Sequence, residues 1–331
     1  MDEFVSLATR HWTEWFESSP CRPLVRVVLA GGPAHRDRAL LALFGAGDAR
    51  PSVVVKVGLS AAEASFVERE FDALTKANEA VAPAFSTTFP RPLMLHRSGG
   101  YTASFTTAIA GRRLVTPAFR GPSAMATPAV VRAFVRRATA WSDELAAQTV
   151  TTSRDAADIA ALVDTFRARF GPQLSHEREL DAFGRRVSIE RIVWNDGWQH
   201  GDLTMPNVLV AHGRLRVLDW EHAGPDRQPW LDAGTLPGML AFLAKRQGVG
   251  STLVETAKVV LSTKGRIGAV IESELRRAWH HPIPIGWAVT LAAMHKALLA
   301  ARNIERPAWA DLAIALVQDR SLRSQLGWMA P

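Results

Sequence analysis

The chain has 331 residues, 47% of them apolar, which is enough to bury a sizeable core and usually forms more than one compact unit. Its formal charge of +7 and its sequence pI of about 10.2 raise the possibility of nucleic-acid binding. The arginines, however, are scattered in pairs through helical segments, and no basic block of five or more occurs. Solvated helix faces explain this charge better, so we expect no specific nucleic-acid partner.

The cysteine content and the apolar runs indicate a compartment. Cys21 is the only cysteine, so no intrachain disulfide can form and a reducing cytoplasm is the simplest location. The N-terminus begins acidic and lacks the basic-then-apolar order of a signal peptide. The apolar stretch 285–299 is interrupted by His295 and Lys296 and is too short to span a bilayer, so it predicts a buried helix. We expect no transmembrane segment, and the oligomeric state does not follow from the sequence.

The N-terminal part of the chain predicts a small antiparallel sheet. A helix over 3–18 has an apolar side, which packs on a sheet more often than on a membrane. A second helix is expected over 60–78. Between the first two strands, Gly31 and Gly32 permit close approach of the backbone to a phosphate, although a plain hairpin turn is the better interpretation of this loop alone. The expected strands are 25–29, 39–44, 53–57 and 101–107.

A lysine lies inside one of these strands. Lys56 belongs to the β-branched run 52–58, and a buried ammonium needs an anionic partner or a ligand. Ser60 followed by Glu63 is a capping-box signature that starts the next helix, so Glu63 is expected to be occupied at the cap. At about 100° per residue, Glu70 falls within the apolar stripe of that helix and is the acid expected to pair with Lys56. A salt bridge without any ligand is an equally good interpretation of these two residues alone.

The rest of the chain predicts a mostly helical unit. One helix begins after Thr127, with Pro128 at its first position, and carries apolar residues at helical spacing. The sequence contains no internal repeat and no low-complexity segment. The further expected helices are 155–170, 177–194, 230–246, 251–262, 271–280 and 285–304.

The most informative segment is 199–207, Gln-His-Gly-Asp-Leu-Thr-Met-Pro-Asn, which precedes an apolar hairpin. Phosphoryl transfer needs one carboxylate that accepts the proton of the attacking hydroxyl, and an amide and a second carboxylate that hold Mg²⁺ against nucleotide phosphates. Asp202, Asn207 and Asp219 have these chemistries in this order. Because the hairpin would bring its two ends together, Asn207 and Asp219 are expected to converge on one ion. A surface loop is the alternative for this segment.

This pattern resembles the aminoglycoside phosphotransferase and choline kinase-like family, whose members are relatives of the protein kinases. The family pattern of His-Gly-Asp, four residues, Asn, and a short hairpin to Asp is matched from His200 to Asp219. The resemblance covers roughly residues 25 to 245. It implies a two-lobed protein kinase-like fold of the α+β class. Residues 1–109 would form a small antiparallel-sheet lobe, and residues 110–331 a mostly helical lobe with the catalytic loop and the acceptor site.

The resemblance also implies roles for individual residues. Asp202 is implied as the catalytic base or hydroxyl-positioning acid, and Asn207 and Asp219 are implied as Mg²⁺ ligands. Lys56 would contact the α- and β-phosphates of the nucleotide, and Glu70 would orient Lys56.

Further positions are implied around the nucleotide. The segment 108–114 looks like the hinge between the lobes, where adenine would hydrogen-bond to the backbone. Thr107 and Ile109 are therefore candidate nucleotide-binding positions, together with the loop that contains Gly31 and Gly32.

Three residues are expected to support the site. His200 should be structural, packing or hydrogen-bonding under the loop. Asp232 resembles the acid that braces the catalytic loop in the family, with a helix-dipole interaction as an equal alternative. Glu221 either adds an outer-sphere metal contact or faces solvent. The chain departs from the protein kinases at Gly201, where they have Arg, and at Trp220, where they have Phe, so activation-loop regulation is not inferred.

These observations predict in-line transfer of the γ-phosphoryl group of ATP, or of GTP, to a hydroxyl of a small molecule. A sugar-like or antibiotic-like acceptor is preferred, and a choline-type or other small metabolite is the alternative. Two alternatives from other functional classes stay open: a catalytically silent nucleotide-binding module and a nucleic-acid-binding protein. Some acidic residues could recognise a cationic acceptor, and some tryptophans could stack on a sugar or a quaternary amine, but the sequence does not show which of them lie together. These residues are Asp226, Glu272, Glu274, Asp311, Trp198, Trp230, Trp279 and Trp287.

Overall fold

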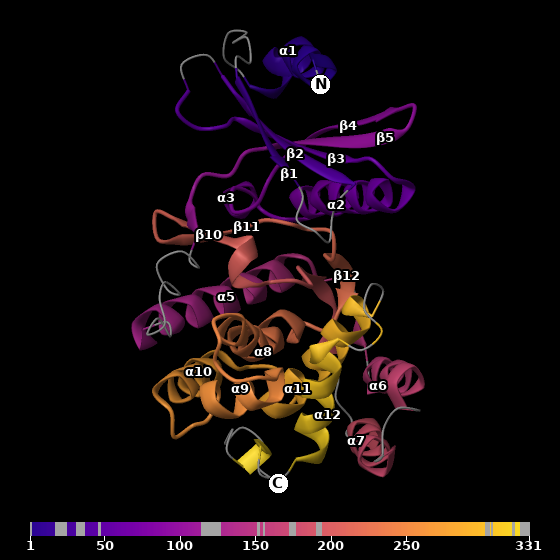
Figure 1. Cartoon of the computed structure of the whole chain (residues 1–331), viewed down its shortest axis with the longest axis vertical. Coiled ribbons are helices and arrows are strands. Elements are labelled where there is room, and N and C mark those ends of the chain that lie inside the picture. The colour runs from indigo at the N-terminus through magenta and orange to yellow at the C-terminus, as the bar shows by residue number, and fades with distance from the viewer. Residues whose placement is uncertain are drawn as a thin grey trace. The chain divides into compact units, whose positions relative to one another are not determined.

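The computed structural model divides the chain into two compact units, and most of their elements are labelled in Figure 1. The first unit comprises Met1–Arg112 and Leu209–Ala223, and the second comprises Arg113–Val208 and Gly224–Pro331. The first unit thus contains, besides the N-terminal part of the chain, a short segment from much later in the sequence. The structure describes residues 2–16, 25–30, 37–45, 48–113, 127–150, 153–154, 156–171, 177–189, 194–301, 305, 307–319 and 322–324.

The first unit is built on a five-stranded antiparallel sheet with the strand order β1-β2-β3-β5-β4. Strand β4 was not expected from the sequence. Its side chains are half-buried or exposed along its whole length, so it shows no alternation of apolar and polar residues, as is common for a strand at the edge of a sheet. The strands are β1 (Val25–Ala30), β2 (Arg38–Phe44), β3 (Val53–Gly58), β4 (Pro92–Ser98) and β5 (Tyr101–Thr107).

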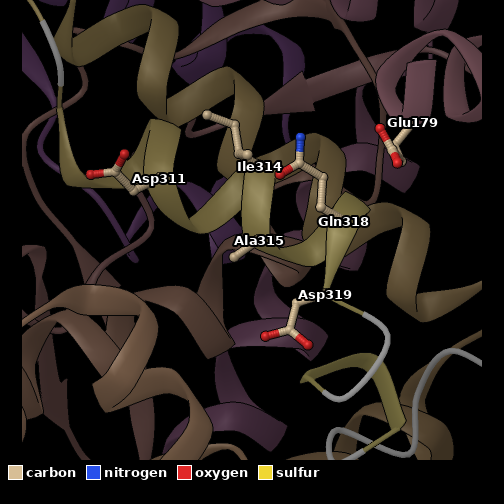
Figure 2. A pocket seen from close by; sticks show the side chains of 6 residues that line it. All are labelled: Glu179, Asp311, Ile314, Ala315, Gln318 and Asp319. Atoms are coloured by element: carbon tan, nitrogen blue, oxygen red, sulfur yellow. The ribbon is translucent and has the colours of Figure 1, made fainter. Parts of the chain in front are cut away.

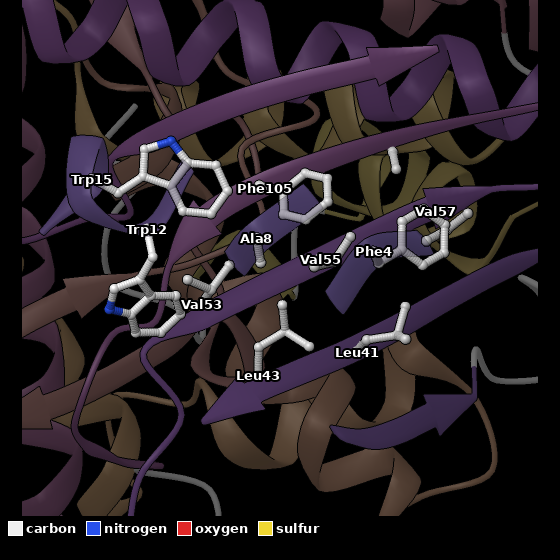
Figure 3. Close-up of a cluster of buried hydrophobic side chains, with 11 residues drawn as sticks. Phe4, Ala8, Trp12, Trp15, Leu41, Leu43, Val53, Val55, Val57 and Phe105 are labelled. Carbon is white, nitrogen blue, oxygen red and sulfur yellow. The ribbon is translucent and has the colours of Figure 1, made fainter. Parts of the chain in front are cut away.

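Helices α1 (Asp2–Trp15) and α2 (Ala61–Ala80) pack on this sheet. Phe4, Trp12 and Trp15 of α1 join one buried cluster with apolar side chains of β2, β3 and β5 (Figure 3). The apolar side of α1 therefore packs on the sheet, as expected. Because successive strand residues point to opposite faces, Val53, Val55 and Val57 of β3 face α1, and Lys56 points to the other face, toward α2.

The first unit also contains the short helix α3 (Pro83–Ser86) and, apart from Val208, the hairpin of β10 (Val208–Ala211) and β11 (Arg214–Val217). The hairpin turn is made by His212 and Gly213, which both have positive φ (49° and 76°). Two successive residues with positive φ are typical of a tight two-residue hairpin turn. Strand β10 starts directly after the 3₁₀ turn η2 (Met205–Asn207), and β6 (Arg112–Arg113) extends the hairpin to the order β11-β10-β6.

The second unit is mostly helical, as expected. Its two short sheets pair β7 (Ser153–Arg154) with β8 (Trp194–Asn195) and β9 (Gly197–Gln199) with β12 (Gly224–Arg227). Its helices are α5 (Pro128–Gln148), α6 (Ala156–Phe170), α7 (Glu177–Ile189), α8 (Leu231–Arg246), α9 (Leu253–Val260), α10 (Arg266–Ala278), α11 (Ile285–Ala300) and α12 (Ala308–Gln318).

Some boundaries differ from the expectation. The helix expected over 177–194 ends at Ile189, and residues 194–195 and 197–199 are strands. A short apolar run fits a strand as well as a helix, and here it is extended. Helix α10 starts at Arg266 instead of residue 271, and α12 was not expected.

Helices α8 and α11 form the centre of the second unit. Helix α11 is buried along most of its length, so the apolar stretch 285–299 is a buried helix, as expected. The two helices approach closely at Gly234, where an added Cβ would lie 2.6 Å from the backbone oxygen of Ala288. Among the described residues, no helix combines the length and apolarity that crossing a membrane requires.

Candidate active site

The first group of site residues surrounds Lys56 in the first unit. Its Nζ atom forms ion pairs with Glu70 of α2 and with Asp219, whose Oδ1 lies 2.8 Å away. The side chains of Lys56 and Glu70 are 14% and 9% exposed, whereas that of Asp219 is 35% exposed. The structure thus contains the Lys56–Glu70 pair that the helical stripe predicts, and it brings Asp219 to the same ammonium.

Charge pairing decides the protonation of this group. Burial lowers the pKa of Lys56, but Glu70 and Asp219 more than offset burial, so the pKa of Lys56 lies above its ordinary value and the ammonium stays charged. Burial raises the pKa of the Glu70 carboxyl. Lys56 opposes this rise, and the negative charges of Asp219 and Glu221 add to it. The group therefore has more carboxylate charge than its one lysine balances.

A second ion-paired group lies next to the first. Arg38 of β2 donates from Nε to Glu63 at 2.6 Å, and its Nη1 lies 2.8 Å from Glu221. All three side chains are at most 12% exposed. Glu221 therefore pairs with Arg38 and does not simply face solvent. The backbone N–H of Glu63 donates to Ser60 Oγ at 3.4 Å, as the cap predicts, but the Glu63 carboxylate binds Arg38, a partner that the sequence analysis missed.

The backbone at Asp219 is held in an unusual conformation. Asp219 has a φ of 65°, in the left-handed region that residues other than glycine rarely adopt. The next residue, Trp220, is fully buried, packs on Phe89 with ring centroids 4.5 Å apart, and donates its N–H to Glu70 Oε1 at 3.2 Å. These contacts hold the strained turn and leave the Asp219 carboxylate partly open to solvent.

The second group of site residues lies in the second unit and surrounds Asp202. Asn207 Nδ2 donates to Asp202 Oδ2 at 2.8 Å and to the Asp202 backbone oxygen at 3.1 Å. Asp202 Oδ1 accepts a hydrogen bond from Lys296 of α11, which also donates to the Gly201 backbone oxygen at 2.9 Å. Gly201 has a φ of 73°, so a glycine suits this turn. The Asp202 side chain is 26% exposed, and that of Lys296 is 8% exposed.

Lys296 is a site residue that the sequence analysis missed. A signal was present, because Lys296 is the one lysine in a helix that has apolar residues on all sides. A lysine in such a helix needs a buried acceptor, by the same reasoning that pointed from Lys56 to Glu70.

Asp232 in the first turn of α8 fixes the loop that carries Asp202. Its carboxylate accepts hydrogen bonds from the backbone N–H groups of His200 at 2.7 Å and of Gly201 at 2.9 Å. Asp232 is 1% exposed, and burial raises its pKa, whereas His200, Lys296 and the two N–H donors lower it. The sequence leaves two roles open for Asp232, bracing the loop or interacting with the helix dipole. The structure contains the hydrogen bonds that brace the loop.

His200 is fully buried under the same loop. Its ring meets Trp141 edge-on at 6.4 Å, and its Nδ1 accepts a hydrogen bond from the Asp202 N–H at 3.3 Å. Because a backbone N–H can only donate, this contact requires that Nδ1 carry no proton.

The other nucleotide-binding positions are less informative. Gly31 and Gly32 lie outside the described residues. The Thr107 backbone N–H donates to the Arg91 backbone oxygen, and the Thr107 hydroxyl accepts from the Arg91 N–H, both at 2.9 Å. The backbone N–H and the hydroxyl of Thr107 are therefore both engaged with the backbone of Arg91. Ile109 is half-buried in the segment that follows β5.

The acceptor candidates do not form one group. Trp198 and Trp230 are buried and therefore serve as core rather than as stacking surfaces. Glu272 pairs with Arg276. The side chain of Asp226 lies outside the part of the chain that the structure describes.

Asp311 lines a separate hollow of about 340 Å³ at α7 and α12, together with Glu179 and Asp319 (Figure 2). Asp319 is already paired with Lys258 at 2.8 Å. None of the residues that contact Lys56 or Asp202 lines this hollow, so we do not assign phosphoryl transfer to it.

Comparison with known proteins identifies the fold. Neither a protein-family model nor a curated protein matches the sequence. Among solved structures, a glucosamine kinase is 15% identical, with 94% of this chain and 81% of that chain covered and a TM-score of 0.50. The aminoglycoside phosphotransferase APH(3'')-Id of Streptomyces rimosus is 14% identical, with 89% and 97% covered and a TM-score of 0.49. Its complex with ADP and streptomycin has the same identity and coverage and a TM-score of 0.47.

The likeness to glucosamine kinase confirms the kinase-like fold that the sequence predicts. The small antiparallel sheet of the first unit and the helical second unit are the two parts expected of that fold. At this level of identity the likeness concerns the fold, and the chemistry has to be argued from the residues.

Proposed function

We propose that this protein is a phosphotransferase that moves the γ-phosphoryl group of ATP, or of GTP, to a hydroxyl group of a small molecule. The observation that carries the proposal is the arrangement of Asp202, a partly exposed carboxylate held between Lys296 and Asn207 on a loop braced by Asp232. A carboxylate fixed in this way is suited to orient a hydroxyl and to accept its proton. The fold shared with a glucosamine kinase supports a sugar-like acceptor.

In this proposal Asp202 acts late in the reaction. A loose transition state for phosphoryl transfer requires positioning and charge neutralisation more than a strong base. Lys296 holds one oxygen of Asp202 in place, and Asn207 holds the second oxygen. Because both oxygens are anchored, the carboxylate loses little further freedom when an acceptor binds.

The residues present fit a magnesium-bound nucleotide. Around Lys56 and Arg38, the carboxylates of Glu63, Glu70, Asp219 and Glu221 outnumber the two cations, so a divalent cation would balance the charge. Asp219 is the most exposed of the four and would be its ligand. A bound Mg²⁺ ion would supply neutralisation of the charge on the phosphates.

Two further residues would hold the nucleotide and its ion. Because Asn207 donates through Nδ2 to Asp202, its Oδ1 is the amide atom suited to ligate magnesium. Lys56 would bind phosphate oxygens with its ammonium, and Glu70 would orient it.

The hairpin explains how Asn207 and Asp219 could act on one ion. Asn207 directly precedes β10, and Asp219 follows the end of β11 by two residues. The start of the first strand and the end of the second strand lie at the same end of a hairpin. The hairpin pattern in the sequence is therefore the basis for proposing Asn207 and Asp219 as ligands of one ion.

A turnover assay tests the proposal. The purified protein is incubated with Mg-ATP or Mg-GTP and with amino sugars, aminoglycosides, nucleosides or choline, and phosphomonoester products are detected by phosphorus NMR. We expect nucleotide consumption that depends on one class of acceptor. Asp202→Asn should lower kcat about 10²- to 10⁴-fold and leave Mg-ATP binding unchanged. The matched control is Asp164→Asn, an aspartate of α6 whose side chain is 63% exposed.

Other outcomes would overturn the proposal. Equal turnover by the wild-type protein and Asp202→Asn would remove the assigned role of Asp202. Tight Mg-ATP binding without consumption for every acceptor would indicate a silent nucleotide-binding module. Tight binding to DNA or RNA with a steep salt dependence, without nucleotide turnover, would indicate a nucleic-acid-binding protein.

A further inference from the structure

The second unit contains a cluster of Asp143, His280 and His281 that the proposed phosphotransferase reaction does not use. Asp143 lies on α5, and the two histidines lie between α10 and α11. One ligand atom from each residue lies within 4.8 Å of those of the other two. Asp143 Oδ1 is 3.4 Å from His281 Nε2 and 3.9 Å from His280 Nε2. Two segments far apart in sequence therefore direct a carboxylate and two imidazoles to one point.

Neither histidine forms a hydrogen bond with Asp143 Oδ1, although both contacts lie within the range of an ion pair. Asp143 Oδ1 is buried and accepts no hydrogen bond from any residue that the structure describes. A buried carboxylate oxygen that accepts no hydrogen bond is unfavourable and calls for an explanation.

The distances do fit ligands of one metal ion. Zinc–nitrogen and zinc–oxygen bonds of about 2.0–2.2 Å place neighbouring ligands of a tetrahedral site about 3.3 Å apart. The Asp143–His281 distance of 3.4 Å matches this spacing, and the Asp143–His280 distance of 3.9 Å is within a small side-chain adjustment of it.

His280 is also oriented as a metal ligand. His280 Nδ1 lies 2.8 Å from the backbone oxygen of Ala278. Because a carbonyl oxygen only accepts, Nδ1 carries the proton, and Nε2 presents its lone pair near Asp143. A hydrogen bond from one ring nitrogen to a backbone carbonyl is the usual support of a metal-bound histidine.

His281 is fixed by packing. Its side chain is 7% exposed, and its ring meets Trp279 and Trp230 edge-on, with centroids 4.9 Å and 6.2 Å apart. The His280 and His281 rings lie 4.5 Å apart. These contacts bring two consecutive side chains to one side of the chain.

We propose that Asp143, His280 and His281 bind a divalent transition-metal ion of the zinc type. Two imidazoles and one carboxylate suit Zn²⁺, whereas Mg²⁺ takes oxygen ligands, so this site differs in chemistry from the one proposed for the nucleotide. His280 is 63% exposed, so water completes the coordination on that side. The ion joins α5 to the segment between α10 and α11 and stabilises the second unit.

Metal binding to the full-length, tag-free protein tests the proposal. Equilibrium dialysis against Zn²⁺ in excess Mg²⁺, with elemental analysis, should show one equivalent more in the wild-type protein than in Asp143→Asn or His280→Gln. The His280 side chain is exposed, so its replacement should leave the fold intact. Co²⁺ should give the visible absorption of a tetrahedral site in the wild-type protein alone. Zn²⁺ should raise Tm for the wild-type protein and not for His280→Gln.

Two control variants make the test specific. His11→Gln removes a histidine whose Nδ1 makes an ordinary 2.8 Å contact with Glu14, and it should keep the full equivalent of Zn²⁺. Asp219→Asn should keep it as well. Equal Zn²⁺ content in the wild-type protein, Asp143→Asn and His280→Gln would overturn the proposal. Loss of Zn²⁺ in Asp219→Asn alone would overturn it too, because the ion would then belong to the Lys56 group.

Discussion

Replacing Lys56 by methionine separates the charge of the buried group in the first unit from its packing. Methionine keeps an unbranched side chain in β3 and removes the ammonium that Glu70 and Asp219 share. The Asp219 side chain is 35% exposed and can be hydrated, whereas that of Glu70 is 9% exposed and would stay buried without a cation. Removing one partner of a buried ion pair destabilises a protein by about 3–5 kcal/mol, and we expect Lys56→Met to fall in this range.

A double-mutant cycle combines Lys56→Met with the replacement of Glu70 by glutamine. Glutamine has the shape of glutamate, keeps an oxygen for the Trp220 N–H and carries no charge. Replacing both members of a buried pair by neutral groups is often close to neutral. The double variant Lys56→Met/Glu70→Gln should therefore recover most of the loss, with a coupling energy of about 2–3 kcal/mol between the two positions.

Urea unfolding of the wild-type protein, both single variants and the double variant measures this coupling. Tryptophan fluorescence follows the transition, and equal m-values show that the same surface is exposed in each case. The control is the exposed strand-to-helix pair of Arg97 and Glu68, 2.6 Å apart, for which the same cycle should give less than about 1 kcal/mol. If the losses of the two single variants simply add in the double variant, an uncompensated buried charge is not the cause.

Three further predictions follow from the second unit. Lys296→Met should lower kcat about 10²-fold with little change in KM for the nucleotide, because Asp202 loses the cation that positions it, and unchanged kcat in an ADP-release assay would contradict this. Because burial raises the pKa of Asp232 above its unfolded value of about 3.9, its contribution to stability is complete below that pH and is lost as the pH rises through the folded pKa. The difference in unfolding free energy between the wild-type protein and Asp232→Asn should thus fall as the pH rises, and a difference independent of pH in urea titrations would refute it. Gly234→Ala should destabilise the protein by about 1–3 kcal/mol, because the new Cβ would lie 2.6 Å from a backbone oxygen of α11. The same change at Gly184 meets its nearest atom at 3.3 Å and should have a smaller effect on Tm.

Local patterns predicted the surroundings of Lys56 well. The β-branched run gave strand β3, the Ser60 cap gave the start of α2, and helical spacing placed Glu70 on the face that meets the strand. Each of these inferences uses residues that are close in sequence. The geometry is therefore fixed by the strand and helix periods, which a sequence reveals directly.

Partners that are distant in sequence were not predictable in the same way. Arg38 is one arginine among many, and nothing near it in the sequence indicates that it lies between Glu63 and Glu221. The cluster of Asp143 with His280 and His281 depends on how α5 packs against α10, which no local period specifies. Such contacts follow from tertiary packing and become visible only when the fold is known.

The Lys56 group and the Asp202 group are built in the same way. In each, an aspartate to which we assign a role pairs with a buried lysine: Asp219 with Lys56, and Asp202 with Lys296. In each, a left-handed residue shapes the turn, with a φ of 65° at Asp219 itself and of 73° at Gly201.

A buried helical acid completes each group by binding backbone N–H groups next to this aspartate. Glu70 accepts from the residue after Asp219, and Asp232 accepts from the two residues before Asp202. Both carboxylates are thereby fixed through their backbone and their side chain, while 35% and 26% of their side-chain surfaces stay exposed. Charged groups that are already oriented need little reorganisation when they meet a metal ion or a hydroxyl, which is what the proposed phosphoryl transfer requires.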